Sequence, residues 1–189
     1  MKIEIVYSIK KQKVIKIDDV YLNSKYNTSI EAKKFIDGYK HVLNDEIIHV
    51  LGLGLGYHIK ELLKITNNKK IKVYILNTEV YNTLKNEIEV KEIINNKNIE
   101  IYFENEIDEY FKTIKKSNDI IIYRPLLKFA ENVEIKNKIE NYIIAKSGIK
   151  KFSIFMEENK LYNESKNYKS ISKFLSNKRK KIKLVASAG

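Results

Sequence analysis

The strongest constraint in this sequence is the segment Val50–Leu63, where an apolar run leads into alternating glycines and leucines and then into a helix-forming run. The glycines are Gly52, Gly54 and Gly56, and the helix is expected to begin near Tyr57. Glycine adopts the positive φ angles that a sharp strand-to-helix turn requires, and it lets the backbone approach a ligand. Free amides at the start of a helix also attract anions. The segment therefore predicts either a nucleotide-type ligand site or a tight turn that packs a helix against a sheet.

Around this turn, apolar runs of strand length alternate with segments of helical periodicity. Strands are expected at Ile47–Leu51, Ile71–Leu76, Ile99–Phe103 and Asp119–Tyr123. Helices are expected at Tyr57–Ile65, Val80–Ile94 and Ile107–Lys115. The strand runs are apolar almost throughout, as in a parallel sheet that is covered on both faces. The pattern predicts that residues 41–125 form a Rossmann-like, doubly wound α/β core with a mostly parallel sheet.

Residues 1–40 have a different pattern. Three short strands are expected, at Lys2–Ile9, Val14–Ile17 and Tyr21–Asn23. The lysine-rich turn between the first two indicates an antiparallel hairpin. Thr28 and Glu31 have the spacing of a helix capping box, which predicts a helix that ends near Tyr39. This region is expected to be a small antiparallel β appendage followed by one helix.

The sequence becomes helical after Pro125, its only proline, and residues 126–181 are expected to pack on the core as a helical segment. The expected helices are Val133–Lys146 and Phe152–Phe174, with an interruption near Ser147–Gly148. The apolar run Ile182–Val185 is expected to be a strand. Because a strand followed by small residues is how a βα unit begins, residues 182–189 are interpreted as the start of a following domain that breaks off.

The formal net charge is +12, but the composition makes a nucleic-acid partner an unfavoured interpretation. Only two of the 36 basic residues, Arg124 and Arg179, are arginine, the residue that base and phosphate recognition favours. Most of the charge is interpreted as solvated surface. No segment resembles a signal peptide or a membrane span, so a cytoplasmic protein without membrane association is predicted. The chain has no cysteine, which excludes disulfides and thiolate metal ligands.

The spacing of the glycines is closer to the G-x-G-x-G turn of S-adenosylmethionine (AdoMet) methyltransferases than to the dinucleotide pattern G-x-G-x-x-G. A nucleotide site in this fold also uses a residue at the end of the second strand to bind ribose hydroxyls. The candidate ligand-binding residues are therefore Gly52, Gly54, Gly56, Tyr57, His58, Asn77 and Glu79. AdoMet or a nucleotide is the candidate cofactor. No residues have the spacing of a metal site or of a catalytic triad, and no catalytic residue is assigned.

Two stretches together resemble a known family. The first is Tyr21–Asn27 followed by Glu31-Ala32, and the second is Gly52–His58, which reads GLGLGYH. This pairing resembles the amino-terminal region of the motility accessory factor (Maf) flagellin glycosyltransferases, with Ser24, Lys25 and Tyr26 as the family-motif residues. The ending Val185–Gly189 resembles the approach to that family's central domain. Departures from the family pattern occur at Asn23, at Thr28 and at Asn77-Thr78.

The resemblance implies a role in flagellin glycosylation, in which a nonulosonic acid passes from its CMP-activated form to serine or threonine hydroxyls. The chemistry would belong to a central catalytic domain, and this region would be a noncatalytic scaffold or docking module. Its expected partners are flagellin and that central domain. The alternative function is an AdoMet- or nucleotide-binding, methyltransferase-like domain. The two hypotheses differ in whether the glycine turn binds a ligand.

Overall fold

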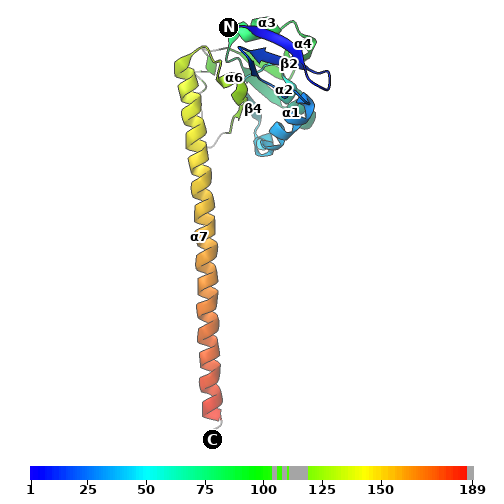
Figure 1. Ribbon diagram of the computed structural model, residues 1–189. Coiled ribbons are helices and arrows are strands. Elements are labelled where there is room, and N and C mark those ends of the chain that lie inside the picture. Colours follow the sequence, from blue (N-terminus) through cyan, green and yellow to red (C-terminus); the bar gives the residue numbers. More distant parts are fainter. Residues whose placement is uncertain (104–105, 108–109, 111–118, 187–189) are drawn as a thin grey trace. The chain divides into compact units, whose positions relative to one another are not determined.

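The computed structural model describes residues 1–103, 106–107, 110 and 119–186, and divides into two compact units, Met1–Lys138 and Ile139–Gly189. The first unit contains all of the strands described, together with the shorter helices (Figure 1). Its architecture is α/β. The second unit consists of most of one long helix, and each unit is described by itself below.

The chain begins with a small antiparallel sheet. Its strands are β1 (Ile3–Tyr7), β2 (Lys13–Ile17) and β3 (Val20–Tyr21), in the order β1-β2-β3. The side chains of Val14, Ile15 and Ile17 on β2 are fully buried. The predicted antiparallel appendage is therefore confirmed, although β1 is shorter than expected and β3 ends before Asn23.

A helix and a short 3-10 turn follow, α1 (Thr28–Asp37) and η1 (Lys40–Asn44). The predicted capping box is wrong, because Asn27 caps α1 instead of Thr28. The Asn27 side chain accepts a hydrogen bond from the Ile30 backbone N–H at 3.0 Å, as an N-cap residue does. The Glu31 carboxylate instead accepts a hydrogen bond from the Ser24 backbone N–H at 2.7 Å. Glu31 therefore connects the helix to the loop before it.

The second sheet is parallel and forms the centre of the first unit. Its strands are β4 (Ile47–Leu51), β5 (Lys70–Tyr74), β6 (Ile99–Tyr102) and β7 (Ile121–Ile122), in the order β6-β5-β4-β7. Fully buried strand residues include Ile48, Val50, Ile71, Val73 and Ile121. The Rossmann-like, parallel α/β prediction is confirmed. The chain crosses to opposite sides of β4, so the carboxyl end of β4 is the topological switch point at which such sheets bind ligands.

The helices after β4 and β5 are α2 (Tyr57–Ile65), α3 (Thr78–Leu84) and α4 (Ile88–Ile94). The prediction of one helix over Val80–Ile94 is wrong. All of Val80, Leu84, Val90 and Ile93 are buried. A straight helix turns about 100° per residue, which would direct the last two away from the first two. The break between α3 and α4 lets both pairs face the core. The helix predicted at Ile107–Lys115 lies mostly outside the described residues.

The chain continues into α6 (Arg124–Leu127), with proline in its first turn, and α7 (Val133–Ala186). The predicted interruption near Ser147–Gly148 is wrong, because α7 is continuous there (Figure 1). A glycine in an exposed helix costs only about 1 kcal/mol relative to alanine, which a long helix tolerates.

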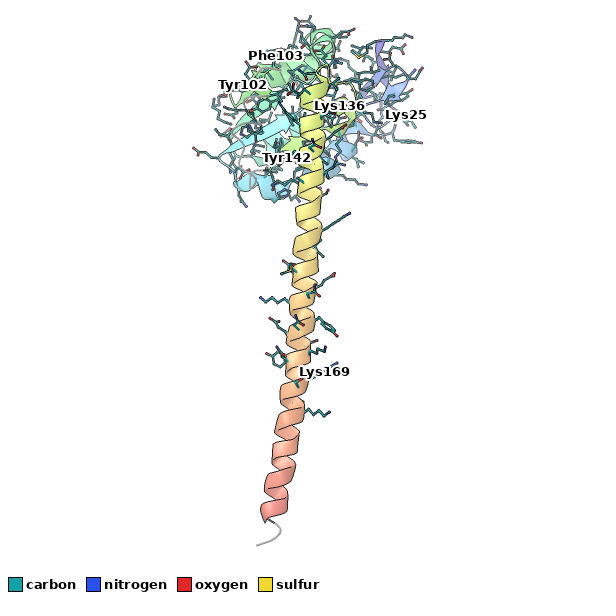
Figure 2. All side chains as sticks on the ribbon, turned by 90° about the vertical axis from the view of Figure 1, so that its left-hand side faces the viewer. Lys25, Tyr102, Phe103, Lys136, Tyr142 and Lys169 are labelled. Carbon is teal, nitrogen blue, oxygen red and sulfur yellow. The ribbon has the colours of Figure 1, made fainter. Side chains whose placement is uncertain are left out.

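The strand predicted at Ile182–Val185 is also wrong, because these residues belong to α7. A short apolar run cannot be assigned to strand or helix by periodicity alone. The proposed domain start at 182–189 depended on that strand, and it stays a prediction. Residues 156–160 and 162–170 of α7 are all exposed, and Figure 2 shows side chains on its surface, among them Lys169. None of the described helices combines the length and the hydropathy of a membrane span.

Replacing Gly56 tests how tightly the glycine turn is packed. Gly56 has φ +72°, and an added Cβ would collide with the side chain of Ile93. We expect Gly56→Ala to lower the free energy of unfolding by about 2–4 kcal/mol through backbone strain and overpacking. Urea unfolding followed by circular dichroism measures this change. The control is Gly148→Ala, which meets no atom within 4 Å; equal destabilisation by both variants would contradict this interpretation.

Candidate functional site

The glycine turn lies at the switch point that the strand order defines. Gly52, Gly54 and Gly56 have φ angles of 96°, 53° and 72°, all in the region that favours glycine. Gly56 caps α2, and its backbone N–H donates to the Leu53 carbonyl at 2.9 Å. The positive φ angles predicted for the turn are therefore confirmed.

The space in front of this turn is filled by the chain's own side chains. A Cβ added at Gly52 would lie 3.3 Å from the Leu126 Cδ1 and Tyr123 Cβ atoms. A Cβ added at Gly54 would lie 3.6 Å from Leu126 and from Ile15 of β2. Because the glycines have no side chains, Tyr123, α6 and β2 can pack closely against the turn.

Little room remains between the turn and the end of β5. The cavity there has a volume of about 10 Å³, and Gly54, Asn77 and Leu126 are among its lining residues. A cavity of this size holds about one water molecule, whereas pockets for small-molecule ligands have volumes of several hundred cubic ångströms. As the described residues form it, the space between Gly54, Asn77 and Leu126 is therefore much smaller than a pocket for AdoMet or a nucleotide.

The two polar residues predicted to bind ribose have other partners. The Asn77 side chain caps α3 by accepting from the Val80 N–H at 2.7 Å, and it donates to the Phe129 carbonyl at 2.7 Å. Both of its functional groups are therefore occupied. Glu79 is exposed, and its backbone N–H donates to the Glu131 carboxylate at 3.2 Å. The structure places Asn77 at the crevice, where it has a structural role, whereas Glu79 is not among the crevice-lining residues.

His58 and Tyr57 begin α2 and are also engaged within the protein. The His58 Nε2 atom lies 3.0 Å from the Gly52 carbonyl oxygen, and its ring stacks on that of Tyr123 with centroids 4.4 Å apart. Burial lowers the pKa of His58 to about 4, so the imidazole is neutral at pH 7. The Tyr57 hydroxyl donates to the Lys13 carbonyl at 3.1 Å. Both side chains connect the turn to its surroundings.

The family-motif residues form the loop between β3 and α1. The Ser24 hydroxyl accepts hydrogen bonds from the backbone N–H groups of Tyr26 and Asn27, at 3.1 and 3.3 Å. The Lys25 ammonium lies 4.0 Å from the centre of the Tyr21 ring, a cation–π contact. Tyr26 is 70% exposed. Ser24 therefore shapes the loop, whereas Lys25 (Figure 2) and Tyr26 lie at the surface.

The two motif stretches, which are distant in the sequence, meet at a second cavity of about 90 Å³. Its lining residues come from the motif loop, α1, the start of α2 and the start of α6: Asn23, Glu31, Ala32, Phe35, Tyr57, His58, Tyr123 and Pro125. The Asn23 Nδ2 group donates to the Tyr123 hydroxyl at 2.7 Å, and that hydroxyl donates to the Leu22 carbonyl. Tyr123 therefore borders both the glycine turn and this cavity.

Several polar side chains around the two cavities are bonded within the protein. Within the described parts of the chain, no cluster of three or more histidine, cysteine or acidic residues could hold a metal ion. His58 is neutral, and its Nε2–H group donates to the Gly52 carbonyl at 3.0 Å.

Comparison with known proteins supports the fold. No protein-family model and no curated protein sequence matches this chain. Among solved structures, spermidine synthase from Thermotoga maritima gives a TM-score of 0.50 at 20% identity, covering 64% of this chain and 43% of that chain. Spermidine synthase bound to the transition-state analogue AdoDATO gives 0.49 at 20% identity, covering 64% and 42%.

The match spans less than half the length of both solved chains. At 20% identity the likeness to the Thermotoga maritima structure shows the fold alone. That fold is the Rossmann-like one that the strand order already indicates. The resemblance to Maf proteins stays a prediction.

Sequence reasoning missed the residues that fill the crevice. Leu126 and Tyr123 follow β7 and carry no recognisable motif, so their position over Gly52 could not be read from spacing. The proline at position 125 was recognised as a boundary, and proline in a first helical turn indicates a helix start. That signal could have located α6, but not the residues it contacts.

The neutral state of His58 predicts a dependence of stability on pH. Its pKa is about 4 in the folded protein and 6.5 at the ordinary value, so the unfolded chain binds a proton first as the pH falls. We expect the free energy of unfolding to be highest above about pH 6.5 and to decrease as the pH falls toward 4. His58 accounts for about 1.4 kcal/mol of this decrease per pH unit. The measurement is urea unfolding at several pH values for the wild type and His58→Gln.

The difference between the two proteins isolates this residue, because His49, whose pKa burial also lowers to about 4, is present in both. The variant is expected to have a shallower loss of stability between pH 6.5 and pH 4. Parallel curves over that range would show that His58 is not buried in its neutral form.

Proposed function

We propose that this chain is a noncatalytic Rossmann-like module that serves as a scaffold or docking domain of a Maf-type flagellin glycosyltransferase. The observation that carries the noncatalytic part is the closed crevice at the carboxyl end of β4. Leu126 and Tyr123 lie against Gly52, and the adjoining cavity measures about 10 Å³. The turn thus packs side chains at the place where a catalytic relative of this fold would bind its cofactor.

The meeting of the two motif stretches supports the family assignment. The loop at 21–27 and Glu31 border the same cavity as Tyr57 and His58 from the second stretch. If the resemblance reflects common ancestry, these residues have been kept together because they build one structural feature. On this proposal, transfer of the nonulosonic acid takes place in another domain, and flagellin is a partner of the whole protein.

Calorimetric titration tests the noncatalytic proposal. We expect no binding of AdoMet, S-adenosylhomocysteine, CMP or a CMP-activated nonulosonic acid to the wild-type chain, because the crevice has room for about one water molecule. Purified flagellin is titrated in parallel, as the ligand that the proposal expects to bind. Micromolar binding of any of the four small ligands would overturn the proposal that the crevice is closed.

The alternative function is AdoMet or nucleotide binding, and the fold together with the positive φ angles of the glycines favours it. Binding would then require Leu126 to leave the crevice. This alternative predicts that Leu126→Ala increases ligand affinity. The closed-module proposal predicts no binding by the variant, because Asn77 remains bonded to Val80 and Phe129.

Leu127→Ala is the matched control, since Leu127 lies on the same short helix and is also buried, at 6% exposure. Each variant is expected to lose about 2–5 kcal/mol of stability, the usual cost of truncating a buried leucine. Thermal unfolding must therefore confirm that both are folded before titration. A gain of affinity in Leu126→Ala alone would establish the alternative.

A further inference from the structure

The 90 Å³ cavity has a wall whose hydrogen-bond donors are already in use. The Tyr57 hydroxyl donates to the Lys13 carbonyl, and the Tyr123 hydroxyl donates to the Leu22 carbonyl. The Asn23 amide group donates to the Tyr123 oxygen. A hydroxyl has a single hydrogen to donate, so neither tyrosine can donate to a molecule inside the cavity.

The orientation of Asn23 follows from the same bonds. Because the hydrogen of the Tyr123 hydroxyl is directed to the Leu22 carbonyl, the Asn23 atom that faces this hydroxyl must be the donor, Nδ2. The Oδ1 atom is then on the other side of the amide, where it is buried and has no hydrogen-bond partner. A buried acceptor without a partner costs free energy, and Asn23 is one of the residues that line the cavity.

The remaining groups of the wall favour a cation. Glu31 contributes a carboxylate, and one of its oxygens accepts from the Ser24 N–H. Phe35 and Tyr123 contribute aromatic rings, packed edge to face with centroids 5.9 Å apart. Carboxylates and the faces of aromatic rings both attract ammonium groups. None of the lining residues is a lysine or an arginine, and the neutral His58 adds no charge.

We infer that this cavity binds the ammonium end of a primary alkylamine, with Glu31 as the counter-ion and the aromatic rings around the methylenes. Its volume of about 90 Å³ is several times the roughly 10–15 Å³ that one water molecule needs. An ammonium group with two or three methylenes therefore fits. The inference does not depend on the proposed function, because it concerns the cavity and not the glycine crevice.

Nuclear magnetic resonance titration of the full ¹⁵N-labelled chain with n-propylammonium chloride at constant ionic strength tests this inference. We expect saturable shifts of the amide signals of Ser24, Ala32 and His58. The neutral analogue 1-propanol has the same size but no charge, and it should not produce them. Equal shifts with both compounds, or no saturation with the amine, would overturn the inference.

Glu31→Gln removes the charge but keeps an oxygen that can accept from Ser24. We expect it to weaken binding of propylammonium by about tenfold or more, the value of a hydrogen bond to a charged group. Glu92→Gln is the matched control, because Glu92 pairs with Lys60 on the surface and is not a lining residue. Unchanged affinity in Glu31→Gln, or an equal loss in both variants, would show that Glu31 is not the counter-ion.

Two sources could provide the same ammonium group: a free small amine or a lysine side chain of another protein. Titration with Nα-acetyl-lysine methylamide distinguishes them. If this compound produces the same shifts and competes with propylammonium, the cavity admits a lysyl side chain. If only propylammonium binds, the cavity is a site for free amines. Absence of binding by both would overturn the inference and leave the closed-crevice proposal unaffected, since that proposal is tested by different ligands.

Discussion

The first unit depends on the packing of Tyr123 and Leu126 against Gly52. This contact joins the end of β7 to the end of β4, and an added Cβ at Gly52 would lie 3.3 Å from both side chains. Any larger residue at Gly52 would have to displace them and would also adopt a strained positive φ. Packing of these side chains therefore requires glycine at this position, whether or not a ligand binds.

Other parts of the unit are arranged around the same contact. The Tyr123 ring stacks on His58, and its hydroxyl bonds to Leu22 and Asn23 in the loop after the small sheet. Ile15 of β2 lies 3.6 Å from the position of an added Cβ at Gly54. The small sheet thus packs over the carboxyl ends of the parallel strands. The Tyr123 side chain, which packs against Gly52, also forms part of the wall of the 90 Å³ cavity.

The two proposals concern the two spaces next to Tyr123, the glycine crevice and the 90 Å³ cavity. The glycine turn has positive φ angles, and the described cavity beside Gly54 measures about 10 Å³. The second cavity measures about 90 Å³, and the Glu31 carboxylate is part of its lining. Binding, if it occurs in this unit, is therefore expected where the motif loop meets α1 and α2.

The sequence by itself determined the features that depend on neighbouring residues. Apolar runs of strand length identified all four parallel strands, and alternating glycines located the turn, because both signals are local. It could not determine the break between α3 and α4 or the continuity of α7 at Gly148, because these depend on which face each segment buries. Nor could it reveal the role of Leu126 over Gly52, since contacts between distant residues leave no periodic pattern. Only the tertiary structure decided that the crevice is filled, because the filling side chains arrive on β7 and α6 after the chain has crossed the sheet.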